Sequence, residues 1–335
     1  MNLIIIKKIN TMRRLLSIGL AVMCVAFFIF NATVQDEVDV NKGIELLNGA
    51  VKSVEGKQYD QAIQQANDAM KIATEAGEAG TELKTNLEKL IPQLYYGKAA
   101  NLVTESKFDD ALKAFDEAKV QADKYNAANI KENIGEAIPK MYFAMGKNDI
   151  DAGNFEKGIE SLTKVTELEP NNASAYLFIG FAALKNSDLA KAEEASAKSL
   201  ELATAANDEA IMKNVKPQLT NVYLMKAQAA MKAKKWSDTY AADEKALSVD
   251  ENNANGLMLK GVAAAQLKRW DNVIDTFTKL ASVSKKDQST SYYNIAVAYQ
   301  NKSNAAKACE FYKKLVSDAK YKDHAEQAIN QLKCK

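Results

Sequence analysis

The chain has 335 residues, with 44 Lys and Arg against 43 Asp and Glu, so its net charge is close to zero. Its basic residues are interspersed with acids, which excludes the basic stripe typical of nucleic-acid-binding proteins. Only 4 prolines and 14 glycines interrupt the chain, a composition that favours helix. The length fits either two globular domains or one long array of repeats.

The N-terminal segment differs from everything after it. Four basic residues precede an uncharged, apolar run over residues 15–30: Lys7, Lys8, Arg13 and Arg14. That order is typical of a secretory signal peptide, here of a bacterial type. Residues 1–35 are therefore predicted to be either a cleaved signal peptide or a retained N-terminal membrane anchor, with translation starting at Met1 or at Met12. In both cases we expect the remainder to be exported and to be periplasmic or envelope-associated.

Bulky residues recur along the rest of the chain at the starts of segments with helical periodicity. They are Tyr59, Phe108, Phe155, Leu189, Trp236 and Trp270. Two of the spacings between them are 34 residues, which is the period of a helix-turn-helix repeat, and the others are 47 or 49 residues. The spacing therefore predicts a series of helical hairpins with a helix beginning at each of these six positions.

The longer spacings contain related extra segments. The helical spacing of Leu83, Leu87 and Leu90 recurs 47 residues later, and a similar spacing follows again from Ile211. A proline lies within or beside each segment: Pro92, Pro139 and Pro217. We interpret the segments as N-terminal extensions of the first helix of a hairpin, kinked or restarted at proline. They are not linkers, so no domain boundary is expected after residue 36.

The residues that flank these helix starts follow a pattern of large and small side chains. The unit that begins near residue 289 shows it best: Tyr292, Ile295, Ala296, Tyr299, Ala308, Tyr312 and Leu315. This pattern resembles the tetratricopeptide repeat (TPR). The resemblance covers seven units over residues 36–321, starting near 43, 92, 139, 173, 220, 254 and 289, and a capping helix over 322–335.

The resemblance implies an all-α fold, a TPR-type α-solenoid in which helical hairpins form a right-handed superhelix. Small residues such as Gly146 would let two helices approach closely, and large partners such as Leu162 would fill the space beside them. The unit from 220 departs from the pattern, because Thr239 and Asp243 stand where Ala and an aromatic residue are wanted. Its second helix is therefore expected to pack loosely.

The resemblance also implies a concave groove lined by the first helix of each unit, which would bind a protein or peptide. Carried over to this sequence, the groove residues are Tyr96, Phe143, Lys147, Leu177, Phe181, Leu224, Met258 and Tyr293. They suggest a partner segment that is apolar with some acidic character. The alternative is that these side chains simply pack on neighbouring helices.

The best-supported function from sequence is a non-catalytic, extracytoplasmic scaffold for protein–protein interaction. A second hypothesis is an envelope glycan-binding protein of TPR-like fold, but Trp236 and Trp270 both fall at helix starts that point to core positions. We expect no nucleic-acid partner, and contact with a membrane only through the N-terminal segment if it is uncleaved.

Catalysis has few candidate residues. His324 is the only histidine, which excludes histidine triads and multi-histidine metal sites. No glycine-rich phosphate-binding loop is present in the sequence. We therefore predict no catalytic, cofactor-binding or metal-binding residues, and no enzyme activity.

Two cysteines, Cys309 and Cys334, remain after the N-terminal segment. If the closing helix runs antiparallel to the helix before it, Cys334 returns to the level of Cys309. An oxidising compartment would then permit a disulfide. The alternative is two unrelated thiols, with Cys309 buried as a small apolar residue.

Overall fold

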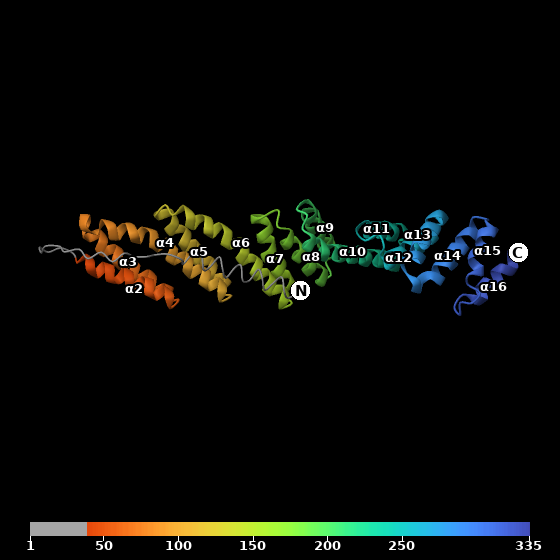
Figure 1. The fold of residues 1–335 in the computed structure, drawn as a ribbon, viewed down its shortest axis with the longest axis horizontal. Helices are drawn as coiled ribbons and strands as arrows, with labels where there is room; N and C mark the ends of the chain where they lie inside the picture. The colour runs from red at the N-terminus through yellow and green to blue at the C-terminus, as the bar shows by residue number, and fades with distance from the viewer. Residues whose placement is uncertain (1–38) are drawn as a thin grey trace. The chain divides into compact units, whose positions relative to one another are not determined.

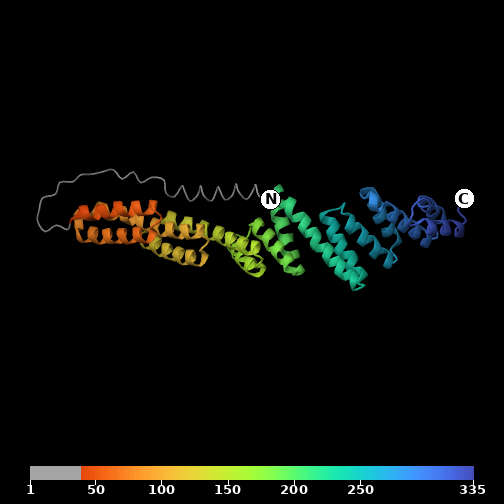
Figure 2. The same cartoon turned by 90° about the horizontal axis from the view of Figure 1, so that it is seen from below.

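The computed structural model describes residues 39–335, and within this range all regular structure is helical and contains no strand. The all-α fold predicted from the sequence is confirmed (Figures 1 and 2). The predicted signal peptide or membrane anchor over residues 1–35 lies outside the described residues.

The helices fall into two compact units, residues 39–141 and 142–335, and the division lies inside helix α6 (Ala128–Asp151). Our expectation of no domain boundary after residue 36 stays a prediction. The division into two units is typical of a repeat architecture. Each hairpin of a stacked array contacts only its neighbours, so no single core holds all the hairpins together.

The first unit consists of two helical hairpins and the first part of α6. Its helices are α2 (Val40–Glu55), α3 (Tyr59–Glu75), α4 (Thr81–Thr104) and α5 (Phe108–Lys124), with a 3-10 turn η1 (Gly77–Gly80) before α4. Its core is built from small residues of α3 and large aliphatic residues of α4, such as Leu87 and Ile91.

The second unit continues with the end of α6 and then repeats the same hairpin. Its further helices are α7 (Phe155–Leu168), α8 (Ala173–Lys185), α9 (Leu189–Ala205), α10 (Glu209–Lys232), α11 (Trp236–Val249), α12 (Ala254–Gln266), α13 (Trp270–Val283), α14 (Gln288–Asn301), α15 (Ala305–Lys313) and α16 (Lys322–Gln331). A second 3-10 turn, η2 (Lys285–Asp287), precedes α14. The last helix, α16, packs on α15 at the C-terminal end of this unit.

All six predicted helix starts are confirmed: each of these residues is the first residue of a helix (α3, α5, α7, α9, α11 and α13). In each hairpin the two helices are joined by only three residues, and the middle one has a positive φ. These middle residues are Lys57, Ser106, Gly153, Ser187, Lys234, Lys268 and Ser303. The left-handed conformation reverses the chain direction within three residues, so the second helix runs back along the first.

The predicted extensions of the first helices are confirmed for α4, α6 and α10. Each has 24 residues, whereas α8 and α12 have 13. The prolines lie inside these helices, so each helix continues through its proline rather than restarting. The extensions are held by burial of their apolar face. Leu83 and Leu87 of α4 are buried, as are Val215 and Leu219 of α10.

The short first helices α8 and α12 begin at a side-chain cap, as the long helix α10 does at Asp208. A polar tetrapeptide precedes α8 and α12, and the last residue of each tetrapeptide caps the helix. The side chain of Asn172 accepts a hydrogen bond from the Ala175 N–H at 3.0 Å, and Asn253 does the same for Gly256 at 3.1 Å. Such caps satisfy backbone donors that the first helical turn leaves free.

Close helix crossings depend on small residues, as the sequence predicted. A Cβ at Gly146 would lie 2.7 Å from the Leu162 side chain and 3.0 Å from the Gly158 carbonyl oxygen. Gly261 of α12 lies directly against the ring of Phe277, which is fully buried. In each case the missing side chain lets a large residue of the second helix fill the crossing.

The expectation that α11 packs loosely is wrong. Thr239, Tyr240, Asp243 and Ala246 are all buried. Thr239 remains satisfied because its hydroxyl donates to the Lys235 carbonyl at 3.0 Å. Asp243 is fully buried, and neither of its carboxyl oxygens has a hydrogen-bond partner among the described residues. The departure from the repeat pattern therefore produces an unsatisfied carboxyl rather than loose packing.

Candidate partner-binding surface

The predicted groove residues of the second unit come together at α6 and α8. The ring of Phe143 on α6 meets the ring of Phe178 on α8 edge to face, with centroids 5.6 Å apart. The ammonium group of Lys147, one turn after Phe143, lies 5.2 Å from the centroid of the Phe178 ring. Phe178 was not among the predicted groove residues. Its ring contacts both Phe143 and Lys147, which were.

The same arrangement recurs one turn further along α8. Phe181 lies three residues after Phe178, a spacing that puts both rings on one face of the helix. Its side chain is 38% exposed, and the ammonium group of Lys185 lies 5.5 Å from its ring centroid. We call Phe143, Lys147, Phe178, Phe181 and Lys185 the α6–α8 patch. It combines apolar rings with two cations that are held over them by cation–π attraction.

Leu177 and Met258 are half-buried and contribute less surface. Met258 packs against the core cluster of α11 to α14. Leu224 is only 8% exposed and lies in a cluster with Tyr223, Ala246 and Leu259. The prediction that Leu224 lines an open groove is therefore wrong, because the next first helix, α12, lies against it: a Cβ at Gly256 would be 3.5 Å from the Leu224 side chain.

Tyr293 is covered by the C-terminal helix region. Its ring stacks on Tyr321, with centroids 4.8 Å apart and the planes 20° from parallel. It also meets Tyr312 and the exposed His324 edge to face. For Tyr293 the alternative interpretation, packing on neighbouring helices, describes the structure.

Tyr96 belongs to the first unit. It is half-buried on α4, with its ring 6.0 Å from that of Phe115. Burial raises the pKa of its hydroxyl, and the negative charge of Glu136 raises it further. Tyr96 is therefore partly accessible and packs against Phe115 of its own hairpin.

The polar groups of the second unit are paired across helices. Glu193 of α9 accepts from Lys226 of α10 and from Lys245 of α11, the latter at 2.8 Å. Burial alone would raise the pKa of Glu193, but the hydrogen bonds from the two lysines outweigh it and lower the pKa. Tyr240 lies under the cations of Lys260 and Arg269, each 4.9 Å from its ring centroid. Glu193, Lys226 and Lys245 thus neutralise one another, whereas Arg269 is held only over a ring.

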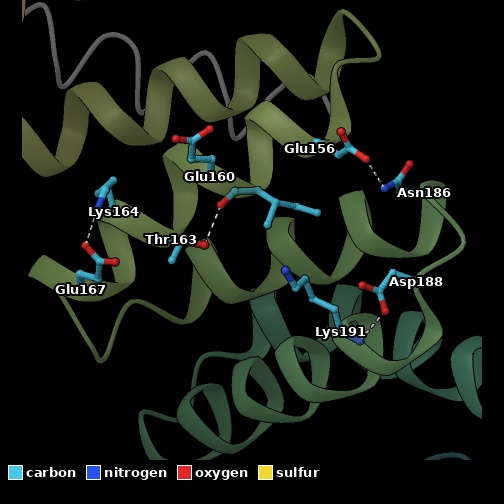
Figure 3. A pocket seen from close by; sticks show the side chains of 9 residues that line it. Glu156, Glu160, Thr163, Lys164, Glu167, Asn186, Asp188 and Lys191 are labelled. Atoms are coloured by element: carbon cyan, nitrogen blue, oxygen red, sulfur yellow. Dashed lines mark hydrogen bonds and ion pairs between the residues drawn. The ribbon is translucent and has the colours of Figure 1, made fainter.

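A shallow pocket lies on the second helices α7 and α9, and most of its polar side chains have partners within it (Figure 3). Its side chains bind one another: Lys164 pairs with Glu167 at 3.0 Å, and the Asn186 amide donates to Glu156 at 3.4 Å. Among residues 39–335 no cluster of three or more His, Cys, Asp or Glu side chains could hold a metal ion. Within the same range no helix is both long and apolar enough to cross a membrane.

The structure joins Cys309 of α15 and Cys334, just after α16, in a disulfide. Their Cα atoms lie 5.6 Å apart and the two residues are 25 positions apart in the chain. The Lys313 ammonium group also donates to the backbone carbonyl of Lys335. At the N-terminal end of α16, the hydroxyl of Tyr321 donates a hydrogen bond to the hydroxyl of Thr290 at 3.0 Å. The closing helix is thus tied down at both of its ends.

Comparison with known proteins agrees with this stack of antiparallel helical hairpins. The family model of the tetratricopeptide repeat matches residues 139–172 and 289–317. The chain therefore contains tetratricopeptide repeats at these residues. A search of curated proteins gave no match.

Solved structures give weaker likenesses. A crystal structure of MamA is 20% identical, with a TM-score of 0.36, and the match covers 56% of this chain and 94% of that one. The structure of YrrB, described as a TPR protein with an unusual peptide-binding site, is 19% identical with a TM-score of 0.36, covering 60% of this chain and 97% of that one. These likenesses are too low to support an inference about function.

Proposed function

We propose that the chain is a non-catalytic, extracytoplasmic scaffold that binds a protein or peptide partner along its first helices. The α6–α8 patch carries this proposal. It places an exposed aromatic ring, Phe181, beside two lysines on first helices. An apolar patch rimmed by polar residues is the kind of surface that marks a protein–protein interaction site. TPR units are interaction modules.

Two observations support export. The charged-then-apolar order of residues 7–30 is that of an export signal. A disulfide such as Cys309–Cys334 persists only in an oxidising compartment, which the periplasm provides. Alkylation of thiols in intact cells, followed by mass measurement, tests this. Two alkylated cysteines at 309 and 334 would place the chain in a reducing compartment.

A photo-crosslinking amino acid at position 181 tests the binding surface. The matched control is position 168, because Leu168 is also an exposed apolar residue of the second unit, at the end of second helix α7. We expect a discrete polypeptide to be crosslinked in the cell envelope from position 181 and not from 168. Equal crosslinking from both positions, or none from 181, would contradict the proposal.

A glycan-binding role is not favoured. Trp236 and Trp270 are both half-buried at the first residue of a helix, and Trp270 packs against the core of α11 to α14. Packing of Trp270 against this core leaves less of its ring surface on which a sugar would stack.

A further inference from the structure

Charge is distributed unequally between the first and second helices of the second unit. Across α8, α12, α14 and the part of α10 from Pro217 onward there is not one Asp or Glu, but there are four lysines: Lys185, Lys226, Lys232 and Lys260. Every second helix of this unit, from α7 to α15, carries at least one acid. These four helical segments are thus free of negative side-chain charge, whereas the part of first helix α6 in this unit ends with Asp149 and Asp151.

Lys226 and Lys260 form ion pairs with acidic side chains, whereas Lys147 and Lys185 of the α6–α8 patch do not. Lys226 pairs with Glu193, and Lys260 pairs with Glu244 at 3.2 Å. Within residues 39–335 neither Lys147 nor Lys185 forms an ion pair, and each is held instead over a phenylalanine ring. Uncompensated positive charge therefore lies directly beside the exposed aromatic surface.

From this arrangement we infer that the α6–α8 patch binds an acidic amphipathic segment of the partner polypeptide. Carboxylates of that segment pair with Lys147 and Lys185, and its apolar side chains rest on Phe143, Phe178 and Phe181. The inference rests on the proposed function, because it names the chemistry of the partner at the same surface.

The other anionic polymers fit less well. A nucleic acid is bound by rows of cations that each meet a phosphate, together with open aromatic faces for its bases. The patch has two lysines and no arginine, and α6 ends with Asp149 and Asp151. One face of Phe178 is taken by Lys147 and its ring also meets Phe143, so stacking space is limited to Phe181. A peptide needs only a few matched charges and a short apolar contact.

Charge exchange tests the inference with defined probes. The full chain is titrated against three fluorescein-labelled 15-residue peptides that share leucines at helical spacing and carry Glu, Gln or Lys at all other positions. We expect the Glu peptide to bind about tenfold more tightly than the Gln peptide, as one or two ion pairs allow, and the Lys peptide to bind least. Binding of the Glu peptide should weaken as salt is raised.

The decisive variant is Lys147→Glu with Lys185→Glu, which should invert the order so that the Lys peptide binds best. The matched control is Lys164→Glu with Lys191→Glu on second helices α7 and α9, which should leave the order unchanged. Far-UV circular dichroism verifies that both variants fold. Phe181→Ala should weaken all three peptides alike, because it removes apolar contact and no charge.

The outcomes separate the inference from the proposed function. Equal binding of the Glu and Gln peptides that still depends on Phe181 overturns the acidic partner and leaves the binding surface standing. Tighter binding of a 15-nucleotide single-stranded DNA or of an oligosaccharide such as chitohexaose than of the Glu peptide overturns both. If no peptide binds, the inference is overturned, and crosslinking from position 181 decides the proposed function.

Discussion

The buried carboxyl of Asp243 makes the second unit sensitive to pH in an unusual direction. Burial raises the pKa of Asp243 to about 8, and attraction by the Lys260 ammonium group opposes this only in part. Lys260 is engaged with Glu244 instead, and Asp243 itself has no hydrogen-bond partner among the described residues. In the unfolded chain an aspartate has a pKa of about 3.9.

The sign of the effect follows from these two values. Between pH 4 and pH 8 the folded state keeps a proton that the unfolded state has released. The contribution of this proton to stability is complete below pH 4 and is lost as the pH rises through about 8. The loss is about 1.4 kcal/mol per pH unit, or roughly 2.7 kcal/mol between pH 5 and pH 7.

Asp243→Asn removes the titrating group while it keeps the size of the side chain. We expect the wild type to lose roughly 2.7 kcal/mol relative to this variant between pH 5 and pH 7. Urea unfolding followed by circular dichroism measures the difference at each pH. Because stacked hairpins can unfold separately, hydrogen exchange of the α10–α12 amides should be recorded on the same samples. Stability curves of the two proteins that run parallel from pH 5 to pH 9 would refute the reasoning.

Three further changes test other parts of the fold, each by thermal or urea denaturation. Gly146→Ala should destabilise the fold by about 1–3 kcal/mol, because a methyl group there would lie 3.0 Å from a backbone carbonyl oxygen of α7. Gly135→Ala in the same helix should stabilise the fold by about 0.5–1 kcal/mol, because no atom lies within 4 Å of the added methyl group. A change of the same sign in both variants would contradict this reasoning. Reducing the Cys309–Cys334 disulfide should lower the free energy of unfolding by about 3.5 kcal/mol for a loop of this length, and α16 should then unfold before the other helices. The stability of Cys334→Ser should not change when reductant is added. Pro217→Ala should stabilise α10 by up to about 3 kcal/mol, because the exposed proline lacks an N–H inside a helix, and a lower melting temperature would refute this.

Helix boundaries could be predicted from the sequence because they depend on local signals. A bulky residue after a short polar turn marked the start of α3, α5, α7, α9, α11 and α13, and all six starts are correct. The turns themselves were not predicted. Six of the seven left-handed positions hold Lys or Ser, and neither residue type signals that conformation, since it costs them about 1–2 kcal/mol.

The candidate surface could be predicted only in part, because exposure depends on which neighbour covers a side chain. Leu177 and Leu224 occupy equivalent places in their units, yet Leu177 is half-buried and Leu224 is only 8% exposed. Tyr293 also followed the pattern, and Tyr321 of a segment outside the repeats stacks on it. The signal for Phe178 was available, since it lies three residues before Phe181 on a helix without acids.

The turn inside each hairpin never varies in length, whereas the connection between hairpins takes several forms: a left-handed Gly or Asn before a 24-residue helix, a capped polar tetrapeptide, or a 3-10 turn. Changes in chain length are therefore accommodated along one edge of the stack. An engineer who wishes to insert a fluorescent domain or an epitope should choose Lys285–Asp287, where the backbone already departs from the repeat. The three-residue turns are poor insertion sites, because one added residue would change the direction of the second helix relative to the first.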